Sequence, residues 1–203
     1  MAKFKIGYLP LSKVNWTNDT LEAARENALA FLKTLPDVEV IGPDHMLTLE
    51  DEAVELLEQF EKDRPDVLIT HFMTFSLGVV PPMFAQRLGV PVILWSMKEP
   101  DPKGGRLQNN SFCAANMNAH HMWRLGIPYF HVHAQAGTKE AEEKLLRQLR
   151  VAKAMKELSR MRIGLIGGRV PGFFTGCVDE MMLRRTLGPE VKIITEHELF
   201  TAA

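Results

Sequence analysis

Short apolar runs recur along the 203-residue chain, each bounded by Gly, Pro, Asp or a polar stretch. The runs are rich in Val, Ile and Leu, which predicts β-strands. The expected strands are 4–9, 38–41, 67–71, 92–96, 129–133, 163–166 and 191–195. Apolar residues occupy both alternating positions of these runs. This is typical of a parallel sheet that is covered on both faces.

Between these runs, apolar residues recur every three or four positions, which predicts amphipathic helices. The expected helices are 20–35, one that begins near Thr48, 82–88, 111–125 and 138–161. Thr48 with Asp51 has the pattern of a capped helix start, and Gly89 and Gly126 suit C-terminal caps. Strands that alternate with helices indicate parallel strands joined by right-handed crossovers.

The pattern divides the chain into an α/β domain at residues 1–137, a connecting helix at 138–161 and a partial second α/β domain at 162–203. The second part holds only a strand, a helix, another strand and a tail from Leu199. A single strand–helix–strand unit buries little core on its own. The predicted fold is therefore a Rossmann-like parallel sheet with helices on both faces, followed by the start of a second α/β domain.

Charge and composition exclude several classes of partner. The formal net charge of −1 gives no electrostatic reason to expect nucleic acid. No apolar run approaches the roughly 18 residues that a membrane helix needs, and the start Met1–Lys5 lacks the apolar region of a signal peptide. Two cysteines are too few for a disulfide scaffold. We therefore expect a cytoplasmic protein with no nucleic-acid or membrane partner.

The third, fourth and fifth expected strands each run into a loop of polar and aromatic side chains. These loops contain Phe75, the amide-rich segment 108–110 and Gln135. Because the carboxyl ends of parallel strands share one edge of a sheet, we expect the loops to meet there. Aromatic faces with amide groups suit a ligand that carries several hydroxyl groups.

Lys13 and Trp16 follow the first expected strand and belong to the same edge of the sheet. The sequence leaves two roles open for the aromatic residues, because a ring at a strand end can line a pocket or anchor the core. Trp95 lies at the end of its strand, which favours the core. Phe75 lies in the loop after its strand, which favours the pocket.

A glycine-rich segment at 167–176 follows the sixth expected strand. It matches neither the phosphate-binding loop nor the dinucleotide fingerprint. Two interpretations stay open. Backbone N–H groups with Arg169 could bind an anion at a helix start, or the glycines only form a tight turn.

Histidines and cysteines offer no complete metal or nucleophile site in the sequence. His131 and His133 share one face of a strand, whereas the adjacent pair at 120–121 points in different directions. No carboxylate lies in these segments, so we expect structural roles for the histidines. Cys113 and Cys177 have no partner base in the sequence. We predict that both are small buried residues.

Four segments together carry a resemblance to a known family. The first is residues 6–10 with Lys13 and Trp16, the second is residues 70–76, the third is residues 105–111, and the fourth is residues 166–173 with the acidic pair at 179–180. Together they resemble the N-terminal region of the L-fucose/L-arabinose isomerase family. The order and spacing of the four carry the likeness, because no single one is diagnostic. The resemblance covers essentially the whole chain but only the front part of a family member.

The resemblance implies a cytoplasmic aldose–ketose isomerase that acts on a monosaccharide as a homo-oligomer, a trimer or a hexamer. Family members use a divalent metal, typically manganese, that is bound by carboxylates and a histidine. Paired acidic residues shuttle a proton through an enediol intermediate. The resemblance places these residues in later parts of a family member, so we expect no metal or other cofactor in this chain alone.

The resemblance also implies that the N-terminal domain contributes substrate contacts, commonly to a neighbouring subunit. Cys113 falls near a histidine of the arabinose isomerases, which argues against L-arabinose as the sugar. The predicted substrate-binding residues are Lys13, Trp16, Phe75, Gln108, Asn110 and Arg169. We expect a part of an isomerase that is inactive alone. The alternatives are a stand-alone sugar- or anion-binding regulatory module without catalysis and a piece that serves assembly.

Overall fold

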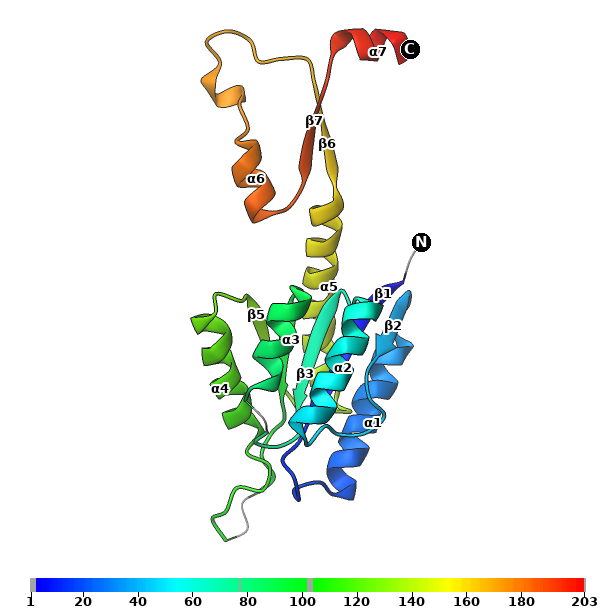
Figure 1. Ribbon diagram of the computed structural model, residues 1–203, viewed down its shortest axis with the longest axis vertical. Helices are drawn as coiled ribbons and strands as arrows, with labels where there is room; N and C mark the ends of the chain where they lie inside the picture. The colour runs from blue at the N-terminus through cyan, green and yellow to red at the C-terminus, as the bar shows by residue number, and fades with distance from the viewer. Residues whose placement is uncertain (1–2, 77, 102–103, 203) are drawn as a thin grey trace. The chain divides into compact units, whose positions relative to one another are not determined.

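The computed structural model describes residues 3–76, 78–101 and 104–202. The described ranges leave out Met1 and Ala2, which belong to the start considered in the sequence analysis, and Ala203, the last residue of the tail. The chain forms two compact units, one that extends to Ala152 and one from Lys153 onward (Figure 1).

The first unit is built on a five-stranded parallel sheet in the order β2-β1-β3-β4-β5 (Figure 1). The strands are β1 (Phe4–Leu11), β2 (Val38–Ile41), β3 (Val67–Phe72), β4 (Val92–Ser96) and β5 (Tyr129–His133). The α/β fold with a parallel sheet is therefore confirmed. β1 and β3 both continue beyond the ends that the sequence predicts. The loops that follow these two strands therefore begin further out at the carboxyl edge of the sheet.

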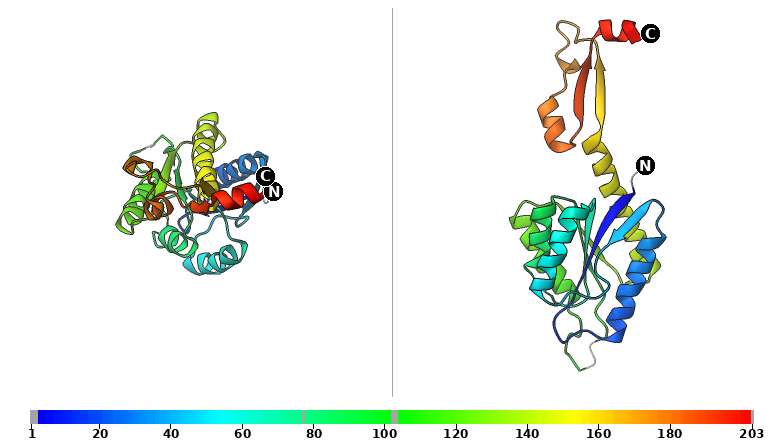
Figure 2. Two further views of the ribbon diagram at one scale, coloured as in Figure 1. Left: turned by 90° about the horizontal axis from the view of Figure 1, so that it is seen from above. Right: turned by 45° about the vertical axis from the view of Figure 1, so that its right-hand side comes forward.

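Helices cover both faces of this sheet (Figure 2). The helices are α1 (Asp19–Thr34), α2 (Glu50–Asp63), α3 (Val80–Leu88), α4 (Ser111–Arg124) and α5 (Lys139–Arg160). α1 and the first part of α5 pack on one face, around Tyr8 and Trp95. α2, α3 and α4 pack on the other, around Leu68 and Leu94. β3 and β4 are buried along their whole length, as their apolar sequences predict.

The strand order creates a crevice between β1 and β3. From β1 the chain first adds β2 on one side and then crosses to add β3 on the other. At such a switch point the two connecting helices lie on opposite faces, so the loops at the carboxyl ends separate and leave room for a ligand. Strand order is not contained in the hydrophobic pattern, so the sequence did not show which strands would flank this crevice.

The helix ends agree with the sequence in part. Gly89 ends α3 in the left-handed conformation, and Gly126 follows α4 with φ 67°, as predicted for C-terminal caps. The predicted cap of α2 at Thr48 is wrong, because Leu49 holds that position and no side chain caps the helix. Thr48 instead donates its backbone N–H toward the Glu52 carboxylate, 3.5 Å away.

The second unit is a small parallel ribbon of β6 (Arg162–Ile166) and β7 (Glu190–Ile194) with short helical segments. These segments are η1 (Phe174–Gly176), α6 (Glu180–Thr186) and α7 (Glu196–Ala202). The tail was not predicted to be helical. None of these strands and helical segments contains a buried residue, which agrees with the expectation that this part buries little core.

Candidate functional site

Two hydroxyl side chains join the ends of β1 and β3 at the crevice. Ser12 Oγ lies 3.1 Å from Thr74 Oγ1, and both residues are fully buried. Thr74 Oγ1 also accepts the backbone N–H of Lys13 at 2.7 Å. These bonds fix the positions of the next residue on each chain segment, Lys13 on one side and Phe75 on the other.

Lys13 and Phe75 line one pocket at this crevice, with a volume of about 320 Å³. The other lining residues are Val14, Thr48 and Ser76. Thr48 reaches the crevice because Leu47 pairs with Leu11 beyond the end of β2. The loop that makes this path passes very close to β1 at Gly42, where a Cβ would lie 2.3 Å from the Tyr8 carbonyl oxygen. The three loops that follow β1, β2 and β3 therefore build the pocket.

Trp16 completes this edge of the sheet. The Lys13 ammonium lies 4.8 Å from the centre of the Trp16 ring, a cation–π contact. The Trp16 backbone N–H donates to the Lys13 carbonyl at 3.1 Å, which closes a tight turn. Lys13, Trp16 and Phe75, three of the predicted substrate-binding residues, are thus neighbours in space.

Gln108 and Asn110 lie in a separate loop that is organised by Glu99. The Glu99 carboxylate accepts the consecutive backbone N–H groups of Gln108, Asn109 and Asn110, the last two at 2.9 and 2.6 Å. Asn109 in turn accepts the Phe75 N–H at 2.8 Å, which joins this loop to the pocket loop. The loops after β3 and β4 therefore meet as predicted, although neither Gln108 nor Asn110 lines the pocket. Glu99 was missed in the sequence, because its partners are backbone groups about ten residues away.

The adjacent ends of β4 and β5 place a serine between two histidines. Ser96 Oγ lies 3.0 Å from His131 Nε2 and 2.9 Å from His133 Nδ1. A hydroxyl has a single proton, so Ser96 donates to one imidazole and accepts from the other. Burial lowers the pKa of both histidines, and the nearby Lys144 lowers them further. These contacts join the ends of β4 and β5 through side chains.

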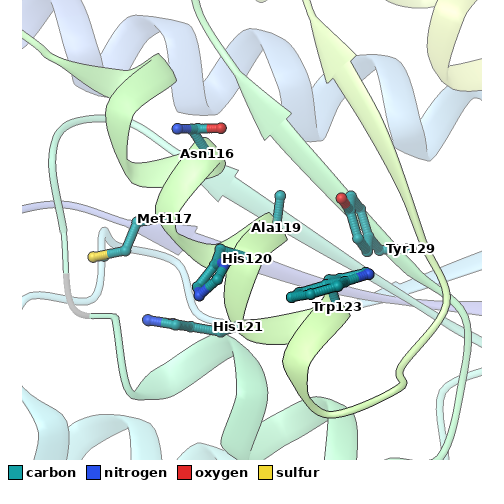
Figure 3. Close-up of a pocket in the computed structure, with 7 residues that line it drawn as sticks. All are labelled: Asn116, Met117, Ala119, His120, His121, Trp123 and Tyr129. Carbon is teal, nitrogen blue, oxygen red and sulfur yellow. The ribbon is translucent and has the colours of Figure 1, made fainter.

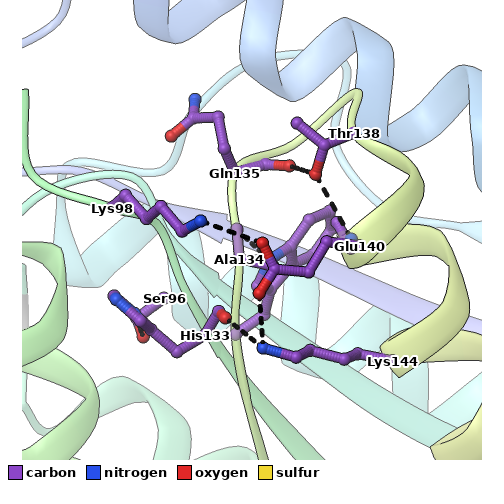
Figure 4. Close-up of polar contacts among 10 residues, drawn as sticks. Ser96, Lys98, His133, Ala134, Gln135, Thr138, Glu140 and Lys144 are labelled. Atoms are coloured by element: carbon purple, nitrogen blue, oxygen red, sulfur yellow. Dashed lines mark hydrogen bonds and ion pairs between the residues drawn. The ribbon is translucent and has the colours of Figure 1, made fainter.

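Two lysines share one carboxylate at the start of α5 (Figure 4). Glu140 pairs with Lys98 at 2.9 Å and with Lys144 at 2.8 Å. Lys144 also donates to the His133 carbonyl at 2.9 Å. Hydrogen bonds from Lys144 and Lys98 lower the pKa of Glu140 to about 2. The single carboxylate balances one of the two positive charges and holds both ammonium groups at the start of α5.

Trp95 is a core residue, as favoured from the sequence. It is 1% exposed, stacks on His71 with 3.8 Å between ring centres, and donates its indole N–H to the Ala134 carbonyl at 2.9 Å. His71 also meets the Tyr8 hydroxyl at 2.7 Å. This row of rings lies directly beneath the carboxyl edge, where it supports the loops without facing the pocket.

A second pocket, of about 530 Å³, lies away from the crevice between α4 and the start of β5 (Figure 3). Its walls include His120, His121, Trp123 and Tyr129. His121 Nδ1 is 3.2 Å from the Gly78 carbonyl oxygen, and Trp123 is 68% exposed. The sequence gave no sign of this aromatic surface as a unit, since its members belong to a helix and a strand.

Arg169 belongs to the second unit, where its guanidinium lies 5.1 Å from the centre of the Phe174 ring. The glycine-rich segment leads into the three-residue η1, and α6 begins only at Glu180. Asp179 caps α6 by accepting the Met182 N–H at 2.9 Å. The helix start that was considered for anion binding is therefore capped by a carboxylate and is separated from Arg169 by several residues.

The prediction for the cysteines is wrong, because Cys113 and Cys177 are both exposed. Cys113 lies on the outer face of α4, whose buried positions include Ser111, Ala114 and Asn118. This helical period could have revealed its exposure. Cys177 lies in the second unit, where no described strand or helix has a buried side chain.

Within residues 3–76, 78–101 and 104–202, no group of three or more His, Cys, Asp or Glu side chains is arranged to hold a metal ion. None of the described helices is both long and apolar enough to cross a membrane.

The comparison with protein families decides the relationship. The N-terminal domain of the fucose/sulfoquinovose isomerases matches residues 7–159 of this chain. The chain belongs to this family. The match begins within β1 and continues past β5, so it includes all three loops that form the pocket. The family resemblance seen in the sequence is confirmed.

Individual relatives of the family cover the chain almost completely. A sulfoquinovose isomerase of Priestia megaterium is 28% identical over 200 residues, which are 98% of this chain and 44% of the relative. One of Alkalicoccus urumqiensis is 28% identical over 196 residues, which are 97% of this chain and 43% of the relative. The chain thus spans less than half the length of these relatives. A solute-binding protein of Actinobacillus succinogenes with bound D-allose aligns with a TM-score of only 0.34 and 17% identity over 95% of this chain and 58% of its own, too weak to support an inference.

Proposed function

We propose that this chain is the substrate-contacting N-terminal part of an aldose–ketose isomerase and does not isomerise sugar alone. The observation that carries the proposal is the pocket at the β1/β3 crevice, which lies within the family match and is lined by Lys13 and Phe75. A half-buried ring offers a flat apolar surface to the C–H face of a monosaccharide, and Thr48 and Ser76 offer hydroxyl groups.

The chemistry of isomerisation requires a group that removes and returns a proton, and we propose that a divalent metal also polarises the sugar oxygens. Among the described residues that line the pocket are a lysine and two hydroxyl side chains but no carboxylate or imidazole. We infer that manganese or a similar ion, and the acidic residues, are supplied by the portion of the longer relatives that this chain does not match. In this account the chain binds and orients the sugar.

The proposal includes assembly with further copies, a trimer or a hexamer, in the cytoplasm. Trp123, Phe112 and Leu125 expose much of their apolar surface on and beside α4, and β5 forms an edge of the sheet. Such surface is typical of a protein contact. The two exposed free cysteines are compatible with a reducing compartment.

The test is an aldose-to-ketose assay of the isolated chain with Mn²⁺, run beside a binding measurement by NMR. We expect shifts at the backbone amides of the pocket loops and no turnover. Turnover by the isolated chain would contradict the proposed division of labour. The alternative, a stand-alone binding module, would bind sugar without any enhancement by the remaining domains of a family member.

A further inference from the structure

The carboxylate of Glu99 gathers the backbone of the amide loop, residues 108–110. Its Oε1 accepts the N–H groups of Gln108 and Asn109, and its Oε2 accepts that of Asn110 at 2.6 Å. Successive N–H groups that converge on one point form a nest for an anion, and the start of α4 directly after Asn110 adds a favourable helix dipole. One half-buried side chain therefore fixes three backbone groups that lie nine to eleven residues further along the chain.

The loop held in this way ties down the backbone of the pocket ring. The Asn109 carbonyl accepts the Phe75 N–H at 2.8 Å, and Glu99 accepts the N–H of the same asparagine at 2.9 Å. The two bonds flank one residue, so the position of the acceptor for Phe75 depends on Glu99. Among the described lining residues of the β1/β3 pocket, Phe75 is present and Glu99 is not. Glu99 thus reaches the pocket through Asn109.

The residue before Phe75 has an anchor of its own. Thr74 Oγ1 accepts the Lys13 N–H at 2.7 Å and lies 3.1 Å from Ser12 Oγ. These bonds join the end of β3 to the loop after β1, but they stop one residue short of the ring. Phe75 itself is only partly buried against the core. The hydrogen bond to Asn109 is therefore a second anchor, and it positions the ring in the pocket.

The start of α4 has a support that does not involve Glu99. The buried hydroxyl of Ser111 accepts the Met97 N–H at 2.9 Å and donates to the Phe72 carbonyl. The first residue of α4 is thereby bonded to the end of β3 and to the residue after β4. Removing the Glu99 carboxylate should consequently release residues 108–110 while the sheet and α4 stay folded.

We propose that Glu99 is a positioning residue for sugar binding, which sets the place of the Phe75 ring through the Asn109 carbonyl. The inference rests on the proposed function, because it concerns the same pocket. A ring that is fixed before the ligand arrives spares binding the cost of ordering it. Glu99→Ala should therefore weaken sugar binding about three- to tenfold, a smaller loss than that caused by removal of the ring itself. Glu99→Gln keeps one acceptor oxygen and should recover part of the affinity.

The experiment is a double-mutant cycle, in which the isolated chain is titrated with sulfoquinovose and followed by NMR. The four proteins are the wild type, Glu99→Ala, Phe75→Ala and the double variant. If Glu99 acts through the ring, its removal should cost about three- to tenfold in the wild type and less than about twofold once the ring is absent. Glu58→Ala, an equal loss of charge on exposed α2 surface, is the matched control and should leave the affinity unchanged in both backgrounds.

Hydrogen exchange without ligand gives a second readout. In Glu99→Ala the Phe75 amide should exchange faster, whereas the Lys13 amide, which Thr74 holds, should not change. Unchanged exchange at Phe75, or faster exchange at both amides, would count against the positioning role.

Two affinity results would overturn the role and leave the sugar pocket in place. One is an equal loss with and without the Phe75 ring, which would mean that Glu99 acts on the sugar by another route. The other is an unchanged affinity of Glu99→Ala beside a wild type that binds. A wild type that binds no sugar would instead overturn the proposed function itself, and this role with it.

Discussion

The Tyr8 hydroxyl lies 2.7 Å from Nδ1 of His71, and both side chains are fully buried beneath the carboxyl edge of the sheet. The bond joins β1 to β3, the two strands that flank the pocket. Burial raises the pKa of Tyr8 well above its ordinary value and lowers that of His71 to about 3. Both groups are therefore neutral at physiological pH, and the pair is a hydrogen bond between uncharged groups.

Removing this bond should destabilise the first unit. Tyr8→Phe leaves Nδ1 of His71 without its partner in a buried site, which costs about 1–3 kcal/mol of unfolding free energy. Urea unfolding measures the loss. Tyr129→Phe is the matched control, because that tyrosine is only half-buried, and it should change the unfolding free energy little. Equal effects of the two substitutions would contradict the role given to Tyr8.

The low pKa of His71 predicts a specific dependence of stability on pH. The folded pKa of about 3 is below the ordinary value of 6.5, so the unfolded chain binds more protons between these values. His71 contributes its stability fully above pH 6.5, and this contribution is lost as the pH falls toward 3. The slope is about 1.4 kcal/mol per pH unit for one proton.

The measurement compares urea unfolding of the wild type and His71→Phe at pH 7.5, 6 and 5. His131 and His133 also have lowered pKa values and contribute in the same direction, but they are present in both proteins. The difference between the two proteins therefore isolates His71. Parallel pH profiles would show that His71 does not stay neutral in the folded state.

Glu99 should hold the amide loop in place. Glu99→Ala removes the acceptor of three consecutive backbone N–H groups, so the amides of Gln108, Asn109 and Asn110 should exchange hydrogen at least tenfold faster. Hydrogen exchange followed by NMR reports each amide separately. Glu58→Ala on exposed α2 surface is the control. Unchanged exchange in the Glu99 variant would mean that the loop is held by other contacts.

The exposed aromatic surface of α4 should support assembly. Placing a charge there with Trp123→Asp should shift sedimentation toward smaller species, because a buried contact would then hold an unpaired carboxylate. Phe174→Asp, a similarly exposed aromatic position in the second unit, serves as the control. Unchanged sedimentation after Trp123→Asp would place the contact between copies on another surface.

The sequence predicted the elements well because buried parallel strands are apolar throughout and end at recognisable turns. Val92–Ser96 and Tyr129–His133 agree with the structure at both ends. The pocket was only partly predictable. Lys13 and Phe75 were assigned to one edge, but their pairing depends on the order of β1 and β3 in the sheet, which hydrophobic patterns do not contain.

Contacts from side chain to backbone were out of reach of the sequence. The carboxylate of Glu99 binds N–H groups that every loop possesses, so no residue type marks its partners.

The bonds of Ser96 to His131 and His133 depend on the alignment of β4 beside β5. The exposed cysteines could have been predicted better. Their residue type suggested burial, but the helical period of α4 favours exposure for Cys113.

Saturable binding of a monosaccharide at the β1/β3 crevice tests the central claim most directly. In an NMR titration of the isolated chain with sulfoquinovose, we expect the largest shifts at the amides of Lys13, Val14, Phe75 and Ser76. Phe75→Ala should weaken binding about tenfold or more, through loss of the ring that faces the sugar. Phe112→Ala, an exposed ring outside the pocket, should leave it unchanged. Shifts that cluster elsewhere, or equal losses in both variants, would contradict the account.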